Sequence, residues 1–421
     1  MKSEMIEKSP IAQSLPETGK WRVLTILTLV CFVSLIERCN LTVIARFVRD
    51  EFHLTNISVG YGFTAFLICY AIGQIPAGLL VDRFGAKRVL LASVTVWALS
   101  TSLFSLLLSG YARSGTIVVL GLILFRSVLG FAEASTFPAA AHAIRVWFPK
   151  RQFGIANSAL LSASFAGEAI AIAVLVWLIE QVGWRWSLFL SVAPAIALGF
   201  GIWLSYPSTA AKTADTETKP PTADPRRRMR MTYLSIGYFF HDYATYLFIF
   251  WFYIYLVDVR GFKSASSGWI AALPTVAAAL AALSVGLWAD RWATRWGRGR
   301  ASLSLIAFSG VGGAVALAVG ALAQNPTVAV GGFVVAMASR GMADAVFWSY
   351  LIHVGDGKVG KMGGIMNLAG NLGGVASTIA APLMSAYLGW TPALLVAALF
   401  TMFTALPAIT NWRDAVVEVA D

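Results

Sequence analysis

Long apolar runs dominate this sequence and leave little choice of fold. A helix needs about 20 apolar residues to cross a bilayer, because each residue adds about 1.5 Å along the helix axis. Hydrophobic residues make up 58% of the chain and charged residues only 13%, too few to cover a soluble fold. The sequence therefore predicts an all-α membrane protein with twelve transmembrane helices, near residues 22–46, 57–81, 88–109, 115–141, 153–179, 185–206, 232–257, 267–289, 301–322, 327–353, 361–387 and 391–411.

A short segment of charge and glycine occurs twice. The first copy, GLLVDRFGAKR, begins at Gly78, and the second, GLWADRWATRWGR, begins 208 residues later at Gly286. That separation is close to half of the 421-residue chain, as the duplication of a membrane bundle would leave it. A polar segment rich in Thr, Pro and Ala divides the copies and indicates a flexible linker. We expect an N-terminal tail at 1–21, a six-helix bundle at 22–206, the linker at 207–231, a second bundle at 232–411 and a C-terminal tail at 412–421.

The basic residues predict how the chain is oriented. Of the 32 Lys and Arg residues, 23 fall on the side of the N-terminus, six on the opposite side and three inside predicted helices. This bias predicts that both termini lie in the cytoplasm and that the protein is a multi-pass protein of a bacterial inner membrane. It also accounts for the formal net charge of +11 without nucleic acid as a partner, since no nucleic-acid-binding motif is present.

Ionisable residues inside the apolar runs are the candidates for function. A charge at the centre of a spanning helix costs about 2.5–3.5 kcal/mol on insertion scales, so such residues face a partner, a cavity or a pathway. Arg126 and Glu133 are two helical turns apart and share one face. Arg340 and Asp344 have the spacing of an intrahelical ion pair, which is as compatible with a structural role as with a functional one. The whole set is Glu37, Arg38, Arg126, Glu133, Glu168, His241, Asp242, Arg340 and Asp344.

These residue types point to a proton and an anion as the cargo. A buried carboxylate beside an arginine can exchange its proton according to which side of the membrane is open. Arginine stays charged and holds a carboxylate through a planar, two-pronged contact. The sequence thus favours a small organic anion and the proton as partners, together with the lipid bilayer. It predicts no other cofactor, no metal site and no catalytic residue, and we expect a monomer.

Several of these stretches resemble known transporters. GLLVDRFGAKR is similar to the loop signature between helices 2 and 3 of the major facilitator superfamily. The stretches ERCNLTVIA (37–45), FRSVLGFAEASTFPA (125–139), GWRWSLF (183–189), AVFWSYL (345–351) and GIMNLAGNLGG (364–374) resemble the anion:cation symporter family, which includes sugar-acid importers and sialin-like carriers. The resemblance implies uptake of an organic anion with protons, by alternating access between two bundles.

The resemblance also implies roles for individual residues. Glu37 and Glu133 would carry protons, and Arg38 and Arg126 would bind the substrate carboxylate. The central site would be lined by Tyr70, Trp348, Ser349, Asn367 and Asn371, and the loop signature would brace a gate through Gly78, Asp82, Arg83 and Gly85, with Asp290 and Arg291 in the second copy.

Two stretches depart from the sugar-acid importers. LSASFAGE at 161–168 ends in an unusual acid, Glu168, and 239–255 is dense in aromatic residues and adds His241-Asp242. His241 and Asp242 either satisfy each other or contact substrate or the proton path. The aromatic residues are more typical of packing than of a binding site, with Tyr243 and Tyr246 the candidates for contact. Together the departures favour a bulkier or partly aromatic polar anion over a simple sugar acid.

Other functions are weighed against import. Proton-driven export of a metabolite, siderophore or drug is compatible with the loop signature, but the proline-rich signature of several drug exporters is absent from 153–179. A membrane sensor without net transport would be expected to carry a signalling extension. An enzyme is disfavoured, because the sequence has no metal-ligand cluster, nucleophile elbow or phosphate loop. Import therefore remains the leading prediction.

Overall fold

The fold is a bundle of helices in two groups. A computed structural model describes residues 17–111, 114–149, 152–207, 225–262, 264–355 and 359–417, and it contains no strand within these ranges. The first group comprises α1 (Glu17–Glu51), α2 (Asn56–Phe84), α3 (Ala86–Leu106) with the π-helical turn Leu107–Tyr111, α4 (Gly115–Glu133), α5 (Thr136–Trp147), α6 (Phe153–Val182), α7 (Trp184–Leu190) and α8 (Ala193–Ser205). The second comprises α9 (Pro225–Asp258), α10 (Ser264–Trp296), α11 (Arg298–Leu322), α12 (Pro326–Gly355), α13 (Val359–Tyr387), α14 (Trp390–Phe403) and α15 (Leu406–Val417).

Three of the twelve predicted passes are broken in the middle. The second segment of each begins within three residues of a proline, namely Pro138, Pro194 or Pro407. Proline has no backbone N–H and its ring clashes with the preceding turn, so it fits the start of a helix better than the interior. The broken passes are α4–α5, α7–α8 and α14–α15, and counting each as one gives the twelve predicted passes.

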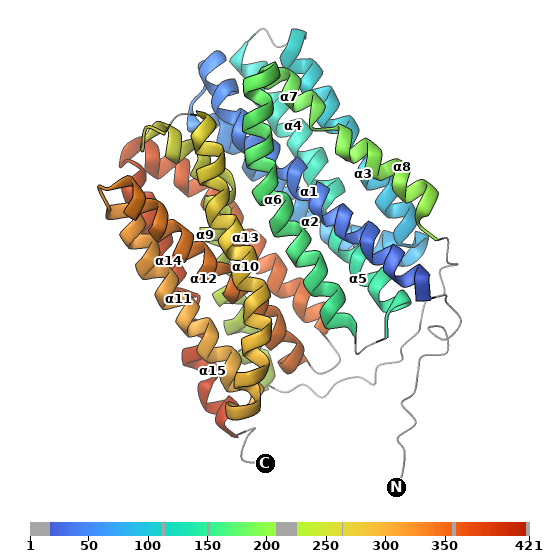
Figure 1. The fold of residues 1–421 in the computed structure, drawn as a ribbon, viewed down its shortest axis with the longest axis vertical. Helices are drawn as coiled ribbons and strands as arrows, with labels where there is room; N and C mark the ends of the chain where they lie inside the picture. Colours follow the sequence, from blue (N-terminus) through green and yellow to red (C-terminus); the bar gives the residue numbers. More distant parts are fainter. Residues whose placement is uncertain are drawn as a thin grey trace.

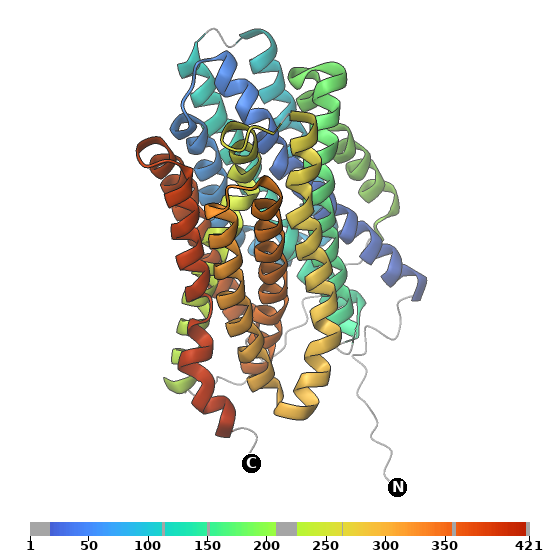
Figure 2. The same ribbon diagram turned by 60° about the vertical axis from the view of Figure 1, so that its left-hand side comes forward.

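The two groups of six passes lie side by side. Figure 1 shows α1 to α8 in blue to green on one side and α9 to α15 in yellow to red on the other, and Figure 2 shows the same division after rotation. The start of α1 and the end of α15 lie toward the same end of the bundle, which we call the terminal end. Of the predicted linker 207–231, residues 208–224 lie outside the described ranges, and 225–231 form the first two turns of α9 rather than linker.

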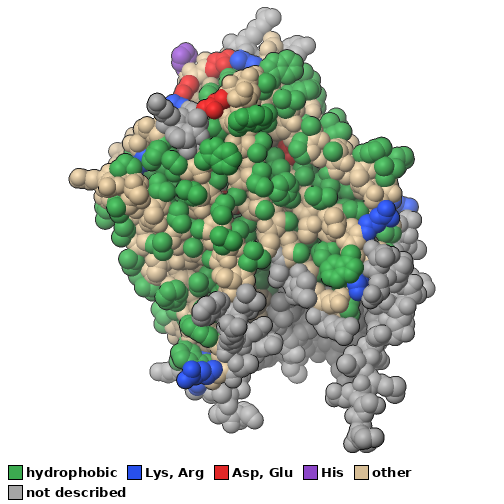
Figure 3. Space-filling model, viewed as in Figure 1, with side chains coloured by type: hydrophobic (Ala, Val, Ile, Leu, Met, Phe, Trp, Pro, Cys, Tyr) green, Lys and Arg blue, Asp and Glu red, His purple; other side chains and the backbone are tan. Residues whose placement is uncertain are grey.

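The surface fits a bilayer. Nine helical stretches of the described residues are long and apolar enough to cross a membrane, and a shorter apolar stretch spans Trp269–Val285 in α10. The helices α9 and α13 fall outside this set, because α9 carries polar aromatic and charged residues and α13 carries asparagines and many glycines. Figure 3 shows hydrophobic side chains over the middle of the bundle and charged ones toward its ends.

The helices α1 and α6 of the first half approach each other closely at a glycine of α6. Gly167 packs directly against the backbone carbonyl of Phe32, so a side chain at this position would collide with α1. Close approach of this kind lets membrane helices gain packing energy that apolar burial cannot supply in lipid. The α1–α6 pair is thus held by backbone contact, next to the charged residues of α1.

We expect Gly167→Ala to lower the melting temperature of the purified protein. The added methyl group overpacks the α1–α6 contact, which costs about 1–3 kcal/mol. The matched control is Gly201→Ala in α8, where nothing lies within 4 Å of the added atom. Both changes improve helix propensity equally, so a Gly167→Ala protein that melts with or above Gly201→Ala would contradict the packing argument.

Candidate functional site

An ion pair between α1 and α4 forms the centre of the first half. Arg38 Nη2 lies 3.3 Å from Glu133 Oε1, and the two side chains are 7% and 1% exposed. The Arg38 guanidinium lies over the rings of Phe66 and Tyr70 in α2, at 5.2 and 4.9 Å from their centroids. Arg38 Nε has no hydrogen-bond partner among the described residues. The pair therefore leaves this guanidinium with a free donor in a buried, aromatic-lined position.

Arg126 holds the backbone of α1. It donates to the carbonyls of Glu37 (3.4 Å) and Arg38 (3.1 Å) and to Asn40 Oδ1 (3.4 Å). Since Glu133 also contacts α1, both α4 residues face that helix, as their spacing predicts. Arg126 positions α1, and through it the Arg38–Glu133 pair.

Glu37 lies on a different face of α1 from Arg38. Its Oε2 accepts from Thr101 in α3 (2.8 Å) and from Asn40 Nδ2 (3.2 Å), and the side chain is fully buried. Asn40, Thr101 and Arg126 also line a small pocket whose walls all belong to the first half. The two predicted proton carriers, Glu37 and Glu133, are thus in separate surroundings, and only Glu133 pairs with Arg38.

A second charged cluster lies where α6 meets α9, α10 and α12. Asp344 accepts a hydrogen bond from Tyr238 (2.8 Å), and Glu168 accepts one from Thr275 (3.2 Å). Arg340 donates through Nε to Thr245 (2.8 Å). Arg340 and Asp344 are both described and form no ion pair within 4.0 Å, so the intrahelical pair compatible with their spacing is not formed. Contacts from α9 replace it.

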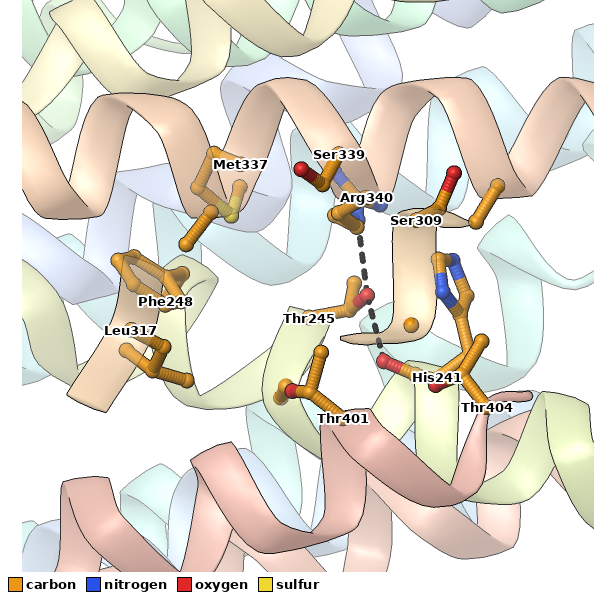
Figure 4. Close-up of a pocket in the computed structure, with 14 residues that line it drawn as sticks. His241, Thr245, Phe248, Ser309, Leu317, Met337, Ser339, Arg340, Thr401 and Thr404 are labelled. Carbon is orange, nitrogen blue, oxygen red and sulfur yellow. Dashed lines mark hydrogen bonds between the residues drawn. The ribbon is translucent and has the colours of Figure 1, made fainter. Parts of the chain in front are cut away.

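His241 points into a pocket within the second half. Figure 4 shows the pocket between α9, α11, α12 and α14, where Thr245 accepts from Arg340 and donates to the His241 carbonyl. The His241 ring packs against Tyr238 and Phe347, and its Nε2 has no hydrogen-bond partner among the described residues. No ion pair joins His241 to Asp242. Of the two alternatives predicted for His241 and Asp242, the one in which they pair with each other is therefore not formed.

Polar contacts of α13 lie near the junction of the halves. Asn371 Oδ1 accepts a hydrogen bond from the Tyr246 hydroxyl of α9 (3.2 Å). Asn367 Nδ2 donates to Gln74 Oε1 (2.9 Å), which joins α13 to α2 across the halves. Of the predicted lining residues, Asn367 is thus brought to the junction of the halves with Asn371 one turn away, and Tyr70 lies beside Arg38 in the first half.

Three other predicted lining residues lie elsewhere. Tyr243 packs against Phe400 of α14, with centroids 4.7 Å apart, on a face of α9 that turns away from the first half. Ser349 is exposed and donates to a carbonyl of its own helix. Trp348 reaches the edge of the second cluster, with its ring 6.5 Å from Tyr238. Helical rotation decides these positions, because residues adjacent in sequence point about 100° apart.

The first copy of the loop signature contacts α5, which belongs to the same half. The Asp82 carboxylate lies 3.5 Å from His142 Nδ1 of α5, and Arg83 packs over the ring of Phe84. Gly85 caps α2 with φ +80°, a conformation that favours glycine, whereas a side chain at Gly78 would meet nothing within 4 Å. The side chains of Asp290 and Arg291 in α10 lie outside the described residues. The gating role of these residues stays a prediction.

Ion pairs join the halves at the end opposite to the terminal end. Asp258, the last residue of α9, lies 3.4 Å from Arg46 and 2.6 Å from Arg49 of α1. Thr42 of α1 also donates to the carbonyl of Ile249 in α9 (3.0 Å). These contacts hold the two halves together at this end.

Sequence reasoning missed several of these partners. Neither Tyr238 nor Thr245 interrupts the apolar pattern strongly enough to be singled out, although each is the hydrogen-bond partner of a charged residue. Asp258 sits at a helix end, where a charge is ordinary. The signal that could have found Tyr238 and Thr245 is their place one turn from His241-Asp242 on α9.

Two bundles of six passes, with a buried ion pair inside the first and a charged cluster where the two meet, define a membrane transporter rather than an enzyme. The sequence matches the Major Facilitator Superfamily over residues 26–378 and, in a second match, 234–418. The chain belongs to this superfamily.

The sequence aligns over most of its length with named transporters. A probable galactarate/D-glucarate transporter of Escherichia coli K12 is 26% identical over 394 residues, 86% of each chain. A probable sulfoacetate transporter of Cupriavidus necator is 28% identical over 377 residues, 85% of each chain. A D-galactonate transporter of E. coli O6:H1 is 24% identical over 434 residues, 95% of this chain and 97% of the relative.

A solved structure shares the fold. The crystal structure of a bacterial homologue of the human lysosomal transporter Spinster, in an inward-facing and unoccupied conformation, superposes with a TM-score of 0.73. It is 18% identical and covers 95% of this chain and 99% of that chain. This likeness supports the twelve-pass architecture.

Proposed function

We propose that the protein imports an organic anion together with protons across a bacterial inner membrane, with both termini in the cytoplasm. The observation that carries the proposal is the buried Arg38–Glu133 pair at the centre of the first half. The relatives named above transport galactarate or D-glucarate, sulfoacetate and D-galactonate according to their names, and all of these are organic acid anions. Those names support an anion as the cargo.

The pair supplies a way to couple the two cargoes. A substrate carboxylate and the Glu133 carboxylate compete for the same guanidinium, that of Arg38. Protonation of Glu133 removes the competitor and leaves Arg38 ready to bind the substrate. Loss of that proton on the other side restores the pair and expels the anion. Arg126, bound to the carbonyls of Glu37 and Arg38, keeps α1 in the position that this exchange requires.

Uptake into proteoliposomes tests the coupling. Under an inward proton gradient we expect the wild-type protein to accumulate a labelled anion, and Glu133→Gln to reach only the level seen without a gradient. The variant keeps a neutral group next to Arg38, so exchange of labelled for unlabelled anion continues. Glu180→Gln on the exposed face of α6 is the matched control. Equal accumulation by wild type and Glu133→Gln would remove Glu133 from the coupling mechanism.

A further inference from the structure

Glu37 is a buried acid that takes no part in the exchange at Arg38 and Glu133. Its side chain is fully buried, and its Oε1 has no hydrogen-bond partner among the described residues. The other oxygen, Oε2, accepts hydrogen bonds from Thr101 (2.8 Å) and Asn40 (3.2 Å). An acid inside a spanning helix is costly and indicates a function. The groups bonded to Glu37 are the ones on which its protonation acts.

Asn40 connects Glu37 to Arg126. Its Nδ2 donates to Glu37 Oε2 (3.2 Å), and its Oδ1 accepts from Arg126 Nη1 (3.4 Å). Both contacts require the same orientation of the amide, because an ionised carboxylate only accepts hydrogen bonds and a guanidinium only donates them. One neutral side chain therefore contacts the acid and the base at the same time.

Arg126 continues the connection to the ion pair. It donates to the backbone carbonyl of Arg38 (3.1 Å), and the Arg38 guanidinium lies 3.3 Å from the carboxylate of Glu133. It also donates to the carbonyl of Glu37 itself (3.4 Å). A continuous series of contacts therefore joins the two predicted proton carriers, although they lie in different surroundings.

A small cavity gives the Asn40 amide room to turn. The cavity measures about 10 Å³, about the room of one water molecule, and Asn40, Thr101 and Arg126 are among its lining residues. A hydrogen bond to an ionised group is roughly twice as strong as one between neutral groups. Protonation of Glu37 therefore weakens the hold of this acid on the amide, and a turn of the amide removes one acceptor from Arg126.

We propose that Asn40 transmits the protonation of Glu37 to Arg126, and through the backbone of α1 to the Arg38–Glu133 pair, so that the two acids exchange their protons in a coupled way. Asn40 is in this sense a positioning residue. Its part in transport rests on the proposed function, to which it adds the link between the two proton carriers. Double-mutant coupling within such hydrogen-bonded networks is commonly large enough to measure.

Infrared spectroscopy of the purified full-length protein tests the link, because the carbonyl band of a buried protonated carboxyl group follows its titration. The bands are assigned by their loss in Glu37→Gln and in Glu133→Gln. The charged groups around Glu37 are Arg126 and Glu133 of α4 and Arg38 beside it on α1. We expect Glu37→Gln to move the titration midpoint of Glu133 by at least about half a pH unit.

Asn40→Leu, which is similar in shape, should reduce that shift to less than half, with the direct interaction of the two charges remaining. The matched control is Thr101→Val, which removes the other donor to the same oxygen and leaves the contact between Asn40 and Arg126 in place. There the shift should persist. Melting temperatures confirm folding, and Asn40→Ala replaces Asn40→Leu if the latter does not fold.

Three results would overturn the proposal. They are an undiminished shift in the folded Asn40 variant, an equal loss of the shift in Thr101→Val, and a wild-type background in which Glu37→Gln leaves Glu133 unmoved or neither band titrates. The second result would assign the effect to the surroundings of Glu37 in general.

Uptake into proteoliposomes separates this inference from the proposed function. The probes are labelled D-galactonate, D-glucarate and sulfoacetate. Under an inward proton gradient we expect Asn40→Leu to accumulate at least about threefold less anion than the wild type. Equal accumulation would remove Asn40 from transport. If the wild type accumulated none of the three anions but showed the infrared shift, the proposed function would fail and the link between the acids would remain.

Discussion

Replacing Arg38 with glutamine is expected to reduce anion uptake by at least about 30-fold, because losing one partner of a buried charge pair costs about 2–5 kcal/mol. The substrate loses its cationic partner, and Glu133 is left buried without its own. Arg38→Lys keeps the charge but loses the planar two-pronged contact, so it should retain part of the activity. Initial rates in proteoliposomes, normalised to the amount of folded protein, give the measurement.

The double variant Arg38→Gln/Glu133→Gln separates binding from folding. The single Arg38 variant should also melt at a lower temperature, since it leaves an uncompensated carboxylate. Removing both charges should restore the melting temperature without restoring uptake. Uptake by Arg38→Gln within threefold of wild type, with the protein folded, would show that the anion is bound elsewhere.

Reversing the charge of Asp258 is expected to open the end of the bundle that its ion pairs close. Asp258→Arg places a third cation beside Arg46 and Arg49. Two unit charges 4 Å apart interact by about 4 kcal/mol at the effective dielectric constant near a protein surface. Changing this attraction to a repulsion therefore exceeds the few kcal/mol that typically separate two conformations of a protein. Transport should fall steeply, because the cycle requires closure at this end.

Spin labels at His53→Cys and Val259→Cys, in a protein without its native cysteines, measure that opening. We expect the distance distribution to shift to longer values in Asp258→Arg. The control is Asp50→Arg, which reverses a charge in the same region but breaks ion pairs only within α1. If the two variants gave the same distances as the parent protein, Asp258 would have no part in closure.

The architecture could be predicted from the sequence because bilayer thickness sets the length of every apolar run. Hydropathy alone merged α4 with α5, α7 with α8 and α14 with α15, since a break of two residues leaves the apolar content of a run unchanged. Pro138, Pro194 and Pro407 marked these breaks in the sequence. The start of α9 was placed too late, because four arginines, at 226–228 and 230, lie in its first turns, beyond the apolar part of the helix.

The charged residues of the site were predictable, but their pairing was not. Hydropathy identifies every ionisable residue within an apolar run, and this was enough to find Arg38, Arg126 and Glu133. Which arginine pairs with Glu133 depends on how α1 is rotated against α4. The same limit applies to Arg340 and Asp344, whose spacing allows an ion pair but whose partners come from α9.

The contacts between the halves differ in kind along the membrane normal. Near the end closed by Asp258 they are ionic and partly exposed, with 15% of the Arg49 side chain and 23% of the Asp258 side chain reached by solvent. Nearer the terminal end, the contact between Asn367 and Gln74 is between neutral amides. Salt screens exposed charges and leaves neutral hydrogen bonds largely unaffected. The ionic strength of the compartment at the Asp258 end therefore acts directly on these described contacts between the halves.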